Sequence, residues 1–179
     1  MRLDALLTDN MQYDAAFADV EITGLTADSR AVAPGYLFAA LPGVQADGNR
    51  FVAQALAKGA AAVLTSQPGH GLSVPVVYDE NPRRALAELA ARFFAFRPDC
   101  TVGITGTNGK TSTAAFVRQF WTHAGLPAAS LGTLGVITAQ FERPMTHTTP
   151  DPVTWHAALR DLYARGITHL AMEVSSHAL

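Results

Sequence analysis

The sequence has a single cysteine, Cys100, so it cannot form a disulfide bond within the chain. It also has no apolar run near the roughly 20 residues that a transmembrane helix needs. The N-terminal segment MRLDALLTDNMQ lacks the apolar core of a secretory signal peptide. Together these absences predict a protein of a reducing, cytoplasmic compartment.

Charge is scarce as well. Charged residues make up 16% of the 179 residues, the formal net charge is −2, and lysine and arginine form no cluster. This balance argues against a nucleic-acid surface or an anionic membrane as a partner, so any bound anion must be held by local features. Hydrophobic residues make up 49% of the chain, which is typical of a folded protein with one large domain or two small ones.

Residues 1–98 predict a small α/β domain. Short apolar segments alternate with turn dipeptides such as Pro42-Gly43 and Asp47-Gly48. The predicted strands lie within DVEITGLTADSR, YLFAAL, AAVLT and VPVVYD, and a helix lies within NRFVAQALAKGA. A second helix follows, with Asn81 as its N-cap and Pro82 in its first position, and we expect it to bridge to the next domain.

From residue 99 the segments become longer. They predict a strand in TVGITG, a helix from Gly109 to His123, a strand in AASLGT, an irregular connection, a helix in DPVTWHAALRDLYARG and a strand in THLAMEVSS. Asp151 and Pro152 are helix start signals, and Gly166 is a stop signal. Alternating strands and helices predict a parallel sheet covered on both faces.

The segment VGITGTNGKTS has the position of a phosphate-binding loop, between an apolar strand and a helix. Gly106 and Gly109 allow backbone N–H groups to turn toward a phosphate, and the helix N-terminus adds positive charge. Lys110 would reach the outer phosphates, and the Thr111 hydroxyl would bind Mg²⁺. Ile104 occupies the place of the first glycine in the usual G-x-x-x-x-G-K-[ST] pattern. The alternative is an ordinary glycine-rich turn.

A second candidate site lies in HLAMEVSSHAL, where an apolar strand ends at Glu173. Ligands of a parallel sheet collect at the carboxyl ends of its strands, so Glu173 and Thr111 could share one Mg²⁺ ion. The alternative is a solvated acid at a strand end. His177 is a lone histidine, which is more often a structural residue than a ligand.

Two further stretches are polar. In MTHTTPDP, Thr148 and Thr149 could donate hydrogen bonds to an anionic or sugar-like substrate, but taken alone this loop favours helix capping by Thr149 and Asp151. Asp28, Ser29 and Arg30 follow a predicted strand, and here a structural pair between Asp28 and Arg30 is the favoured interpretation.

Taken together, these stretches resemble the Mur ligase family, the ATP-dependent amide-forming enzymes of cell-wall precursor synthesis. The resemblance rests on DSR with LFAALPGVQADG, then GITGTNGKTS, LGTLG, THTTPDP and MEVSSHAL, in the family's order over nearly the whole chain. The family's loop is spelled G-T-N-G-K-[ST], which accounts for Ile104. The resemblance implies an α/β fold, with a small substrate-binding domain followed by a phosphate-loop ATPase domain of parallel-sheet type.

The resemblance also implies roles for individual residues. Lys110 and Glu173 would be catalytic, and Thr111 and Glu173 would bind Mg²⁺. ATP would contact Gly106, Thr107, Asn108, Gly109, Lys110, Thr111 and Ser112. The UDP-sugar substrate would contact Ala27, Ser29, Val44, Gln45, Ala46, His147, Thr148, Thr149 and Ser175. His147 stands where relatives often have asparagine.

The implied reaction adds diaminopimelate or lysine to a UDP-N-acetylmuramoyl dipeptide through an acyl phosphate. Residues 1–98 would hold the UDP end, and residues 99–179 would be the first part of the central ATPase domain. The family's C-terminal domain would be absent, so we expect this chain by itself to be inactive. Alternatives are the ligase that adds D-alanyl-D-alanine, folylpolyglutamate synthetase, a generic P-loop kinase or NTPase, and a non-catalytic scaffold.

Overall fold

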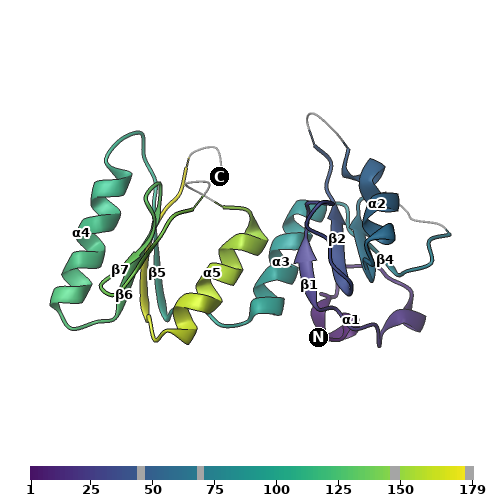
Figure 1. Cartoon of the computed structure of the whole chain (residues 1–179), viewed down its shortest axis with the longest axis horizontal. Helices are drawn as coiled ribbons and strands as arrows, with labels where there is room; N and C mark the ends of the chain where they lie inside the picture. The colour runs from purple at the N-terminus through teal and green to yellow at the C-terminus, as the bar shows by residue number, and fades with distance from the viewer. Residues whose placement is uncertain (44–46, 68–70, 146–149, 176–179) are drawn as a thin grey trace. The chain divides into compact units, whose positions relative to one another are not determined.

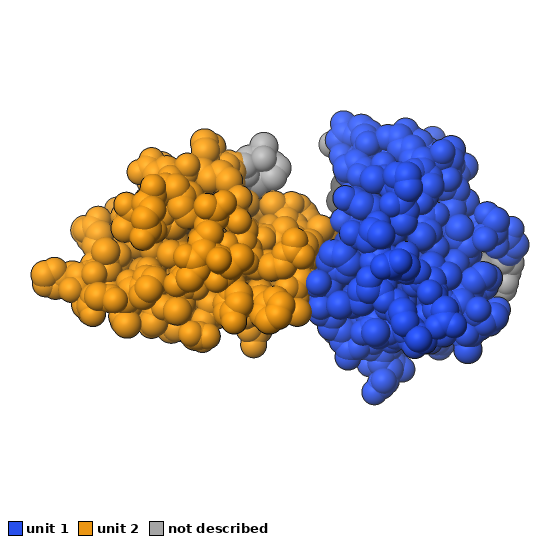
Figure 2. All heavy atoms as spheres, turned by 60° about the horizontal axis from the view of Figure 1, so that its bottom comes forward, with its two compact units in different colours: residues 1–93 blue, residues 94–179 orange. Residues whose placement is uncertain are grey.

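The computed structural model describes residues 1–43, 47–67, 71–145 and 150–175. The chain forms two compact units, Met1–Phe93 and Phe94–Leu179, which Figure 2 shows in different colours. Within the described ranges, no helix has the length and hydrophobicity needed to cross a membrane.

Unit 1 is built on a four-stranded parallel sheet in the order β1-β2-β3-β4. The strands are β1 (Gly24–Thr26), β2 (Tyr36–Ala40), β3 (Ala62–Thr65) and β4 (Val76–Tyr78). The helices are α1 (Leu3–Leu6), α2 (Val52–Ala57) and α3 (Pro82–Phe94), with 3-10 turns η1 (Ala15–Phe17) and η2 (Gly48–Phe51). The two central strands are almost wholly buried because α2 and α3 cover opposite faces of the sheet (Figure 1).

Helix α3 begins as its sequence signals predict. The Asn81 side chain accepts a hydrogen bond from the Arg84 N–H at 3.2 Å, and Pro82 is the first helical residue. Its apolar face is buried through Leu86 and Leu89. The helix ends at the boundary between the two units.

Unit 2 has a five-stranded sheet in the order β5-β9-β6-β7-β8, with α4 on one face and α5 on the other (Figure 1). The strands are β5 (Cys100–Ile104), β6 (Ala128–Gly132), β7 (Gly135–Thr138), β8 (Glu142–Arg143) and β9 (His169–Glu173), and the helices are α4 (Lys110–His123) and α5 (Pro152–Ala164). Leu131, Leu162 and Leu170 are fully buried and join β6, α5 and β9 in one core. The Asp151 carboxylate caps α5 by accepting hydrogen bonds from the N–H groups of Val153 and Thr154, as predicted.

The three strands predicted for the second sheet are parallel as expected, and the sheet has two further strands that were not predicted. Strands β5, β9 and β6 are parallel, but β6, β7 and β8 form an antiparallel meander in place of the expected irregular connection. Gly132 pairs with Gly135 across a two-residue turn, and Gly135 has a φ of 86° that favours glycine. The pattern was missed because four- and two-residue strands are too short to show clear alternation.

Strand β5 is an edge of this sheet within the part of the chain that the structure describes. Its residues Thr101, Val102 and Gly103 are exposed. On α4, Phe116 is 56% and Phe120 is 72% exposed. An edge strand and exposed aromatic side chains of this kind favour self-association.

Replacing Phe120 by serine is therefore expected to weaken self-association without unfolding the chain. Because the ring is already exposed, the free energy of unfolding should change by less than about 0.5 kcal/mol. Sedimentation velocity at several concentrations and urea unfolding measure the two quantities. Gln119→Ser, at an exposed polar position of the same helix, is the control and should change neither. A loss of stability above about 2 kcal/mol in Phe120→Ser, the range of buried large-to-small changes, would contradict this account.

Candidate phosphate and metal site

The loop between β5 and α4 needs glycine at two positions. Gly106 has a φ of 145° and Gly109 a φ of 77°, both in the region that other residues rarely adopt. A Cβ added to Gly109 would meet no atom within 4 Å, and at Gly106 the nearest would be the Asn108 oxygen at 3.9 Å. The backbone conformation, rather than lack of space, therefore requires glycine here.

Ile104 belongs to the sheet and not to the loop. It is the last residue of β5, it lies in register with Glu173 of β9, and its carbonyl accepts the Val174 N–H at 2.8 Å. An extended strand residue has no need for the conformational freedom of glycine. The missing first glycine of the usual pattern is therefore compatible with a phosphate loop of residues 105–109.

Lys110 lies where the loop meets the helix. Its ammonium donates hydrogen bonds to the carbonyls of Gly106 at 2.6 Å and Thr107 at 3.4 Å, so it is folded over the loop. The first N–H groups of a helix have no partners within the helix, and they add partial positive charge at the same point. Lysine and helix terminus thus place positive charge at one point of a chain whose net charge is −2, which is the arrangement that an anion site requires.

Glu173 is buried, with 3% of its surface exposed, and both oxygens of its carboxylate accept hydrogen bonds. Oε2 accepts the Thr111 hydroxyl at 2.9 Å, and the Thr133 backbone N–H donates to Oε1 at 3.0 Å. The Thr133 hydroxyl donates to Oε2 at 3.3 Å. The alternative of a solvated strand-end acid is therefore wrong.

Gly132 and Thr133, which have no individual role in the predicted site, shape the surroundings of Glu173. A Cβ on Gly132 would lie 2.0 Å from Glu173 Oε1, so only glycine leaves room for the carboxylate. Thr133 follows directly and supplies two hydrogen bonds to it. The LGTLG stretch was the only sequence signal for these two residues. Their contact with Glu173 depends on the pairing of β6 with β9, which no local pattern predicts.

The donors around Glu173 suit a hard cation. Carboxylate and hydroxyl oxygens are ligands that Mg²⁺ prefers, and Mg²⁺ usually takes one or two carboxylates together with phosphates and water. No group of three or more histidine, cysteine, aspartate or glutamate side chains is placed to bind a metal among the residues with described positions. Thr111 and Glu173 thus fit a Mg²⁺ ion held jointly with a nucleotide.

The predicted substrate residues of unit 1 lie after β1. Ala27 is exposed, but Ser29 is buried and its hydroxyl donates to Gln54 Oε1 at 2.9 Å. Asp28 and Arg30 form the structural pair that was favoured, with Nη2 to Oδ2 at 2.9 Å. Side-chain and backbone hydrogen bonds from Arg30 lower the pKa of Asp28.

The remaining predicted site residues are Ser175, which the structure describes, and seven residues that lie outside the described ranges. Ser175 is half-buried, two residues beyond the end of β9. The predictions for Val44, Gln45, Ala46, His147, Thr148, Thr149 and His177 lie outside the described residues. A cavity of about 630 Å³ in unit 2 is lined by residues on both sides of segment 146–149, including Arg143, Met145, Pro150 and Asp151.

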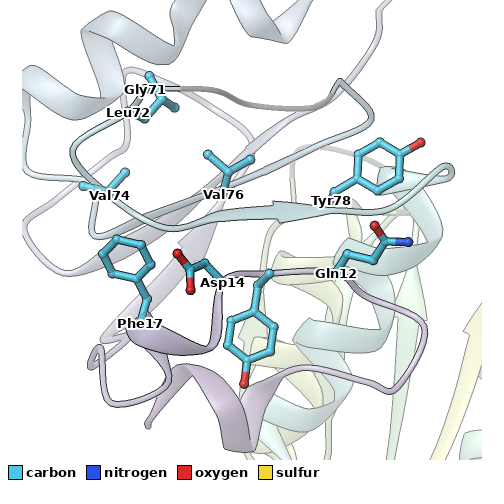
Figure 3. Close-up of a pocket in the computed structure, with 9 residues that line it drawn as sticks. Gln12, Asp14, Phe17, Gly71, Leu72, Val74, Val76 and Tyr78 are labelled. Carbon is cyan, nitrogen blue, oxygen red and sulfur yellow. The ribbon is translucent and has the colours of Figure 1, made fainter.

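Another cavity, of about 640 Å³, lies in unit 1 beside edge strand β4. Figure 3 shows Asp14 and Phe17 beside the chain segment that carries Val74 and Val76, and all four line this cavity. None of the predicted site residues lines it. Ala27 and Ser29 follow β1, the opposite edge of the same sheet.

The fold and the loop define the class: an α/β protein whose second unit has a phosphate-loop topology, with an acidic strand end beside the loop. Profile comparisons specify it further. The Mur ligase middle domain matches residues 104–179, and the catalytic domain of the Mur ligase family matches residues 21–94. The chain belongs to the Mur ligase family.

Curated relatives and solved structures agree. The UDP-N-acetylmuramoyl-L-alanyl-D-glutamate--2,6-diaminopimelate ligase of Brucella melitensis is 46% identical over 181 residues, covering 100% of this chain and 37% of the relative. The enzyme of the same name from Agrobacterium fabrum is 52% identical over 162 residues, covering 89% and 32%. A solved structure of such a ligase superposes with a TM-score of 0.77 at 29% identity, covering 92% of this chain and 34% of that one. The chain thus spans about a third of the length of these relatives.

A MurF ligase from Thermotoga maritima, solved in complex with ADP, shares the fold with a TM-score of 0.60. It is 21% identical and covers 86% of this chain and 32% of its own length. At this identity the likeness supports the fold alone.

Proposed function

We propose that this chain supplies the UDP-substrate domain and the phosphate loop of an ATP-dependent ligase that adds diaminopimelate to a UDP-N-acetylmuramoyl dipeptide. The observation that supports it most is the contact between Thr111, in the first turn of α4, and Glu173, at the end of β9. This contact puts a hydroxyl and a carboxylate beside the loop where a nucleotide-bound Mg²⁺ would lie. Relatives 44–52% identical to the chain have the diaminopimelate ligase name.

The proposed chemistry needs no side-chain nucleophile. ATP transfers its γ-phosphoryl group to the terminal carboxylate of the dipeptide substrate, and the amine of diaminopimelate attacks the acyl phosphate and releases phosphate. ATP and the substrate carboxylate are both anionic. The Lys110 ammonium and the α4 N-terminus therefore reduce their repulsion and stabilise negative charge on the γ-phosphoryl group during its transfer. A bound Mg²⁺ would neutralise charge on the phosphate oxygens.

In this proposal residues 1–98 bind the UDP end of the substrate and residues 99–179 bind ATP. Ala27, Ser29 and residues 44–46 would contact the UDP-sugar, and Thr148, Thr149, His147 and Ser175 would contact the part of the substrate near its reacting end. The ATP contacts would be Gly106, Thr107, Asn108, Gly109, Lys110, Thr111 and Ser112. Lysine in place of diaminopimelate is the alternative amino acid.

Calorimetry of nucleotide binding, with and without Mg²⁺, tests the ATP site. We expect Mg²⁺ to tighten ADP binding to the unsubstituted chain, because the ion would join Glu173 and Thr111 to the phosphates. In Glu173→Gln the gain in ADP affinity on adding Mg²⁺ should be smaller by a factor of roughly ten, or about 1.4 kcal/mol. The amide keeps the shape of the carboxylate and loses its charge. Glu142→Gln, at an exposed carboxylate of β8, is the matched control and should retain the effect.

Two outcomes would count against this assignment. An unchanged Mg²⁺ effect in Glu173→Gln would remove Glu173 from the metal site. Failure of the unsubstituted chain to bind ADP or ATP would favour the scaffold alternative. For the amide-forming step, the whole protein with ATP, Mg²⁺ and the UDP-dipeptide should consume diaminopimelate, and mass spectrometry of the product distinguishes it from lysine and from D-alanyl-D-alanine.

A further inference from the structure

The cavity of about 640 Å³ beside β4 lies where a short antiparallel pairing ends. The Gln12 N–H donates to the Tyr78 carbonyl at 3.0 Å, and the Tyr78 N–H donates to the Gln12 carbonyl at 2.8 Å. In this register the next hydrogen-bonded pair would join Asp14 to Val76. Asp14 instead caps the 3-10 turn η1, where its Oδ1 accepts the Ala16 N–H at 3.0 Å. The chain therefore turns away from β4, and the pairing stops short of Val76.

Val76 keeps an unpaired backbone edge on this side of β4. The Pro75 carbonyl accepts the Val63 N–H at 3.0 Å, and the Asp79 N–H donates to the last residue of β3 at 3.2 Å. Backbone groups alternate in direction along a strand, so those of Val76 point away from β3, toward the cavity that Val76 lines. No hydrogen bond joins them to another residue of the described ranges. The cavity thus receives a free carbonyl and a free N–H.

The side chains that line the cavity are apolar, aromatic and acidic. Leu72, Val74 and Val76 are spaced two residues apart, and all three line it. The Phe17 ring and the Asp14 carboxylate lie beside this segment (Figure 3). Asp14 Oδ2 accepts no hydrogen bond from a residue whose position the structure describes. The described lining includes no lysine, arginine or histidine, so this carboxylate is its only charged group.

We propose that this cavity binds a small organic cation with an apolar body, of the amidinium or ammonium class. The Asp14 carboxylate and the Val76 carbonyl are acceptors, and such a cation supplies N–H donors to both and opposite charge to the first. The Phe17 ring adds a cation–π contact. A volume of about 640 Å³ is within the usual range of small-molecule sites and leaves room for a water on the Val76 N–H. The proposal is independent of the ligase function, because none of the residues assigned to ATP or the UDP-sugar lines this cavity.

Benzamidine, benzamide and benzoate are matched probes, because each has a phenyl ring and a planar head group and they differ in charge. We expect benzamidine to bind the 179-residue chain about fivefold more tightly than benzamide, from one partly exposed ion pair and one cation–π contact. Benzoate should bind more weakly than benzamide. Titration of the ¹⁵N-labelled chain, followed by NMR, measures each Kd, and the Phe17 and Val76 amide signals should shift with benzamidine.

Asp14→Asn tests the carboxylate without removing the cap. The asparagine side chain keeps an oxygen for the Ala16 N–H and loses the charge, so the preference for benzamidine over benzamide should fall below about twofold. Asp47→Asn is the matched control. Asp47 caps the 3-10 turn η2 in the same way, by accepting the Asn49 N–H at 3.0 Å, and it does not line the cavity. This variant should keep the full preference.

Three results would overturn the proposal. They are equal affinities of the unsubstituted chain for benzamidine and benzamide, shifts confined to signals outside residues 12–17 and 71–78, and an undiminished preference in Asp14→Asn. A loss in Asp47→Asn equal to that in Asp14→Asn would also contradict it. If Asp14→Asn does not fold, the three probes on the unsubstituted chain still decide, and the ligase assignment is judged separately by ADP binding.

Discussion

Lys110→Ala is expected to weaken ADP and ATP binding by at least about 100-fold, or about 2.7 kcal/mol. The ammonium lies within 2.6 Å of the Gly106 carbonyl, over the loop that would receive the phosphates. The phosphates of ATP are strongly anionic, and the chain has no cluster of cations to replace a lost lysine. The remaining attraction would come from the α4 N-terminus, which is worth about 1 kcal/mol or less when exposed.

The other lysine of the chain provides the control. Lys58 belongs to unit 1, where it donates to the Arg30 carbonyl at 2.7 Å, whereas the loop belongs to unit 2. Lys58→Ala should leave nucleotide affinity within about twofold, and both variants should melt within a few degrees of the unsubstituted chain because neither ammonium is deeply buried. Isothermal calorimetry with ADP measures the affinities. Equal affinities for the two variants would show that Lys110 does not contact the nucleotide.

Gly135→Ala is expected to destabilise unit 2 by about 3 kcal/mol or more. Gly135 has a φ of 86°, and an added Cβ would lie 2.2 Å from the Arg143 carbonyl oxygen and 2.9 Å from the Pro144 Cα. Both obstacles are backbone atoms and cannot rotate away. The antiparallel pairing of β7 with β8 would have to separate, in addition to the strain of a left-handed residue with a side chain.

Gly125→Ala isolates the strain that a side chain causes on a residue with a left-handed backbone conformation. Gly125 has a similar φ of 78°, but a Cβ there would meet nothing within 4 Å. We therefore expect a loss of about 1 kcal/mol, from the backbone conformation alone. Urea unfolding of both variants, followed by circular dichroism, gives the difference in the free energy of unfolding. A difference below about 1 kcal/mol would mean that the meander adapts to the added methyl group.

Features set by neighbouring residues could be predicted from the sequence. The caps at Asn81 and Asp151 and the pair of Asp28 with Arg30 were all predicted, and each joins residues two or three positions apart. Such bonds depend on local backbone geometry, which the residue types largely specify. The position of the phosphate loop between β5 and α4 was also predictable, because a strand, glycines, a lysine and a helix follow one another directly.

Contacts between distant segments needed the tertiary structure. Thr111 and Glu173 are 62 positions apart, and the Thr133 contact with Glu173 spans 40. The sequence suggested the contact of Thr111 with Glu173, because the carboxyl ends of parallel strands share one edge of a sheet. It did not suggest the contact of Thr133 with Glu173, because no local pattern indicates that β6 lies beside β9. The hydrogen bond from the Thr65 hydroxyl at the end of β3 to Asn49 Oδ1 likewise exists only because β2 and β3 are adjacent.

The sequence by itself therefore determined the Mur ligase family of this protein, the glycine- and lysine-containing loop between β5 and α4, the acidic strand end and the two α/β segments. The tertiary structure decided the sheet order, the antiparallel meander of β6 to β8, and which side chains hold Glu173 in place. The physical reason is the range of the interactions. Backbone conformation and capping are settled within a few residues, whereas strand order and register depend on burial summed over the whole unit.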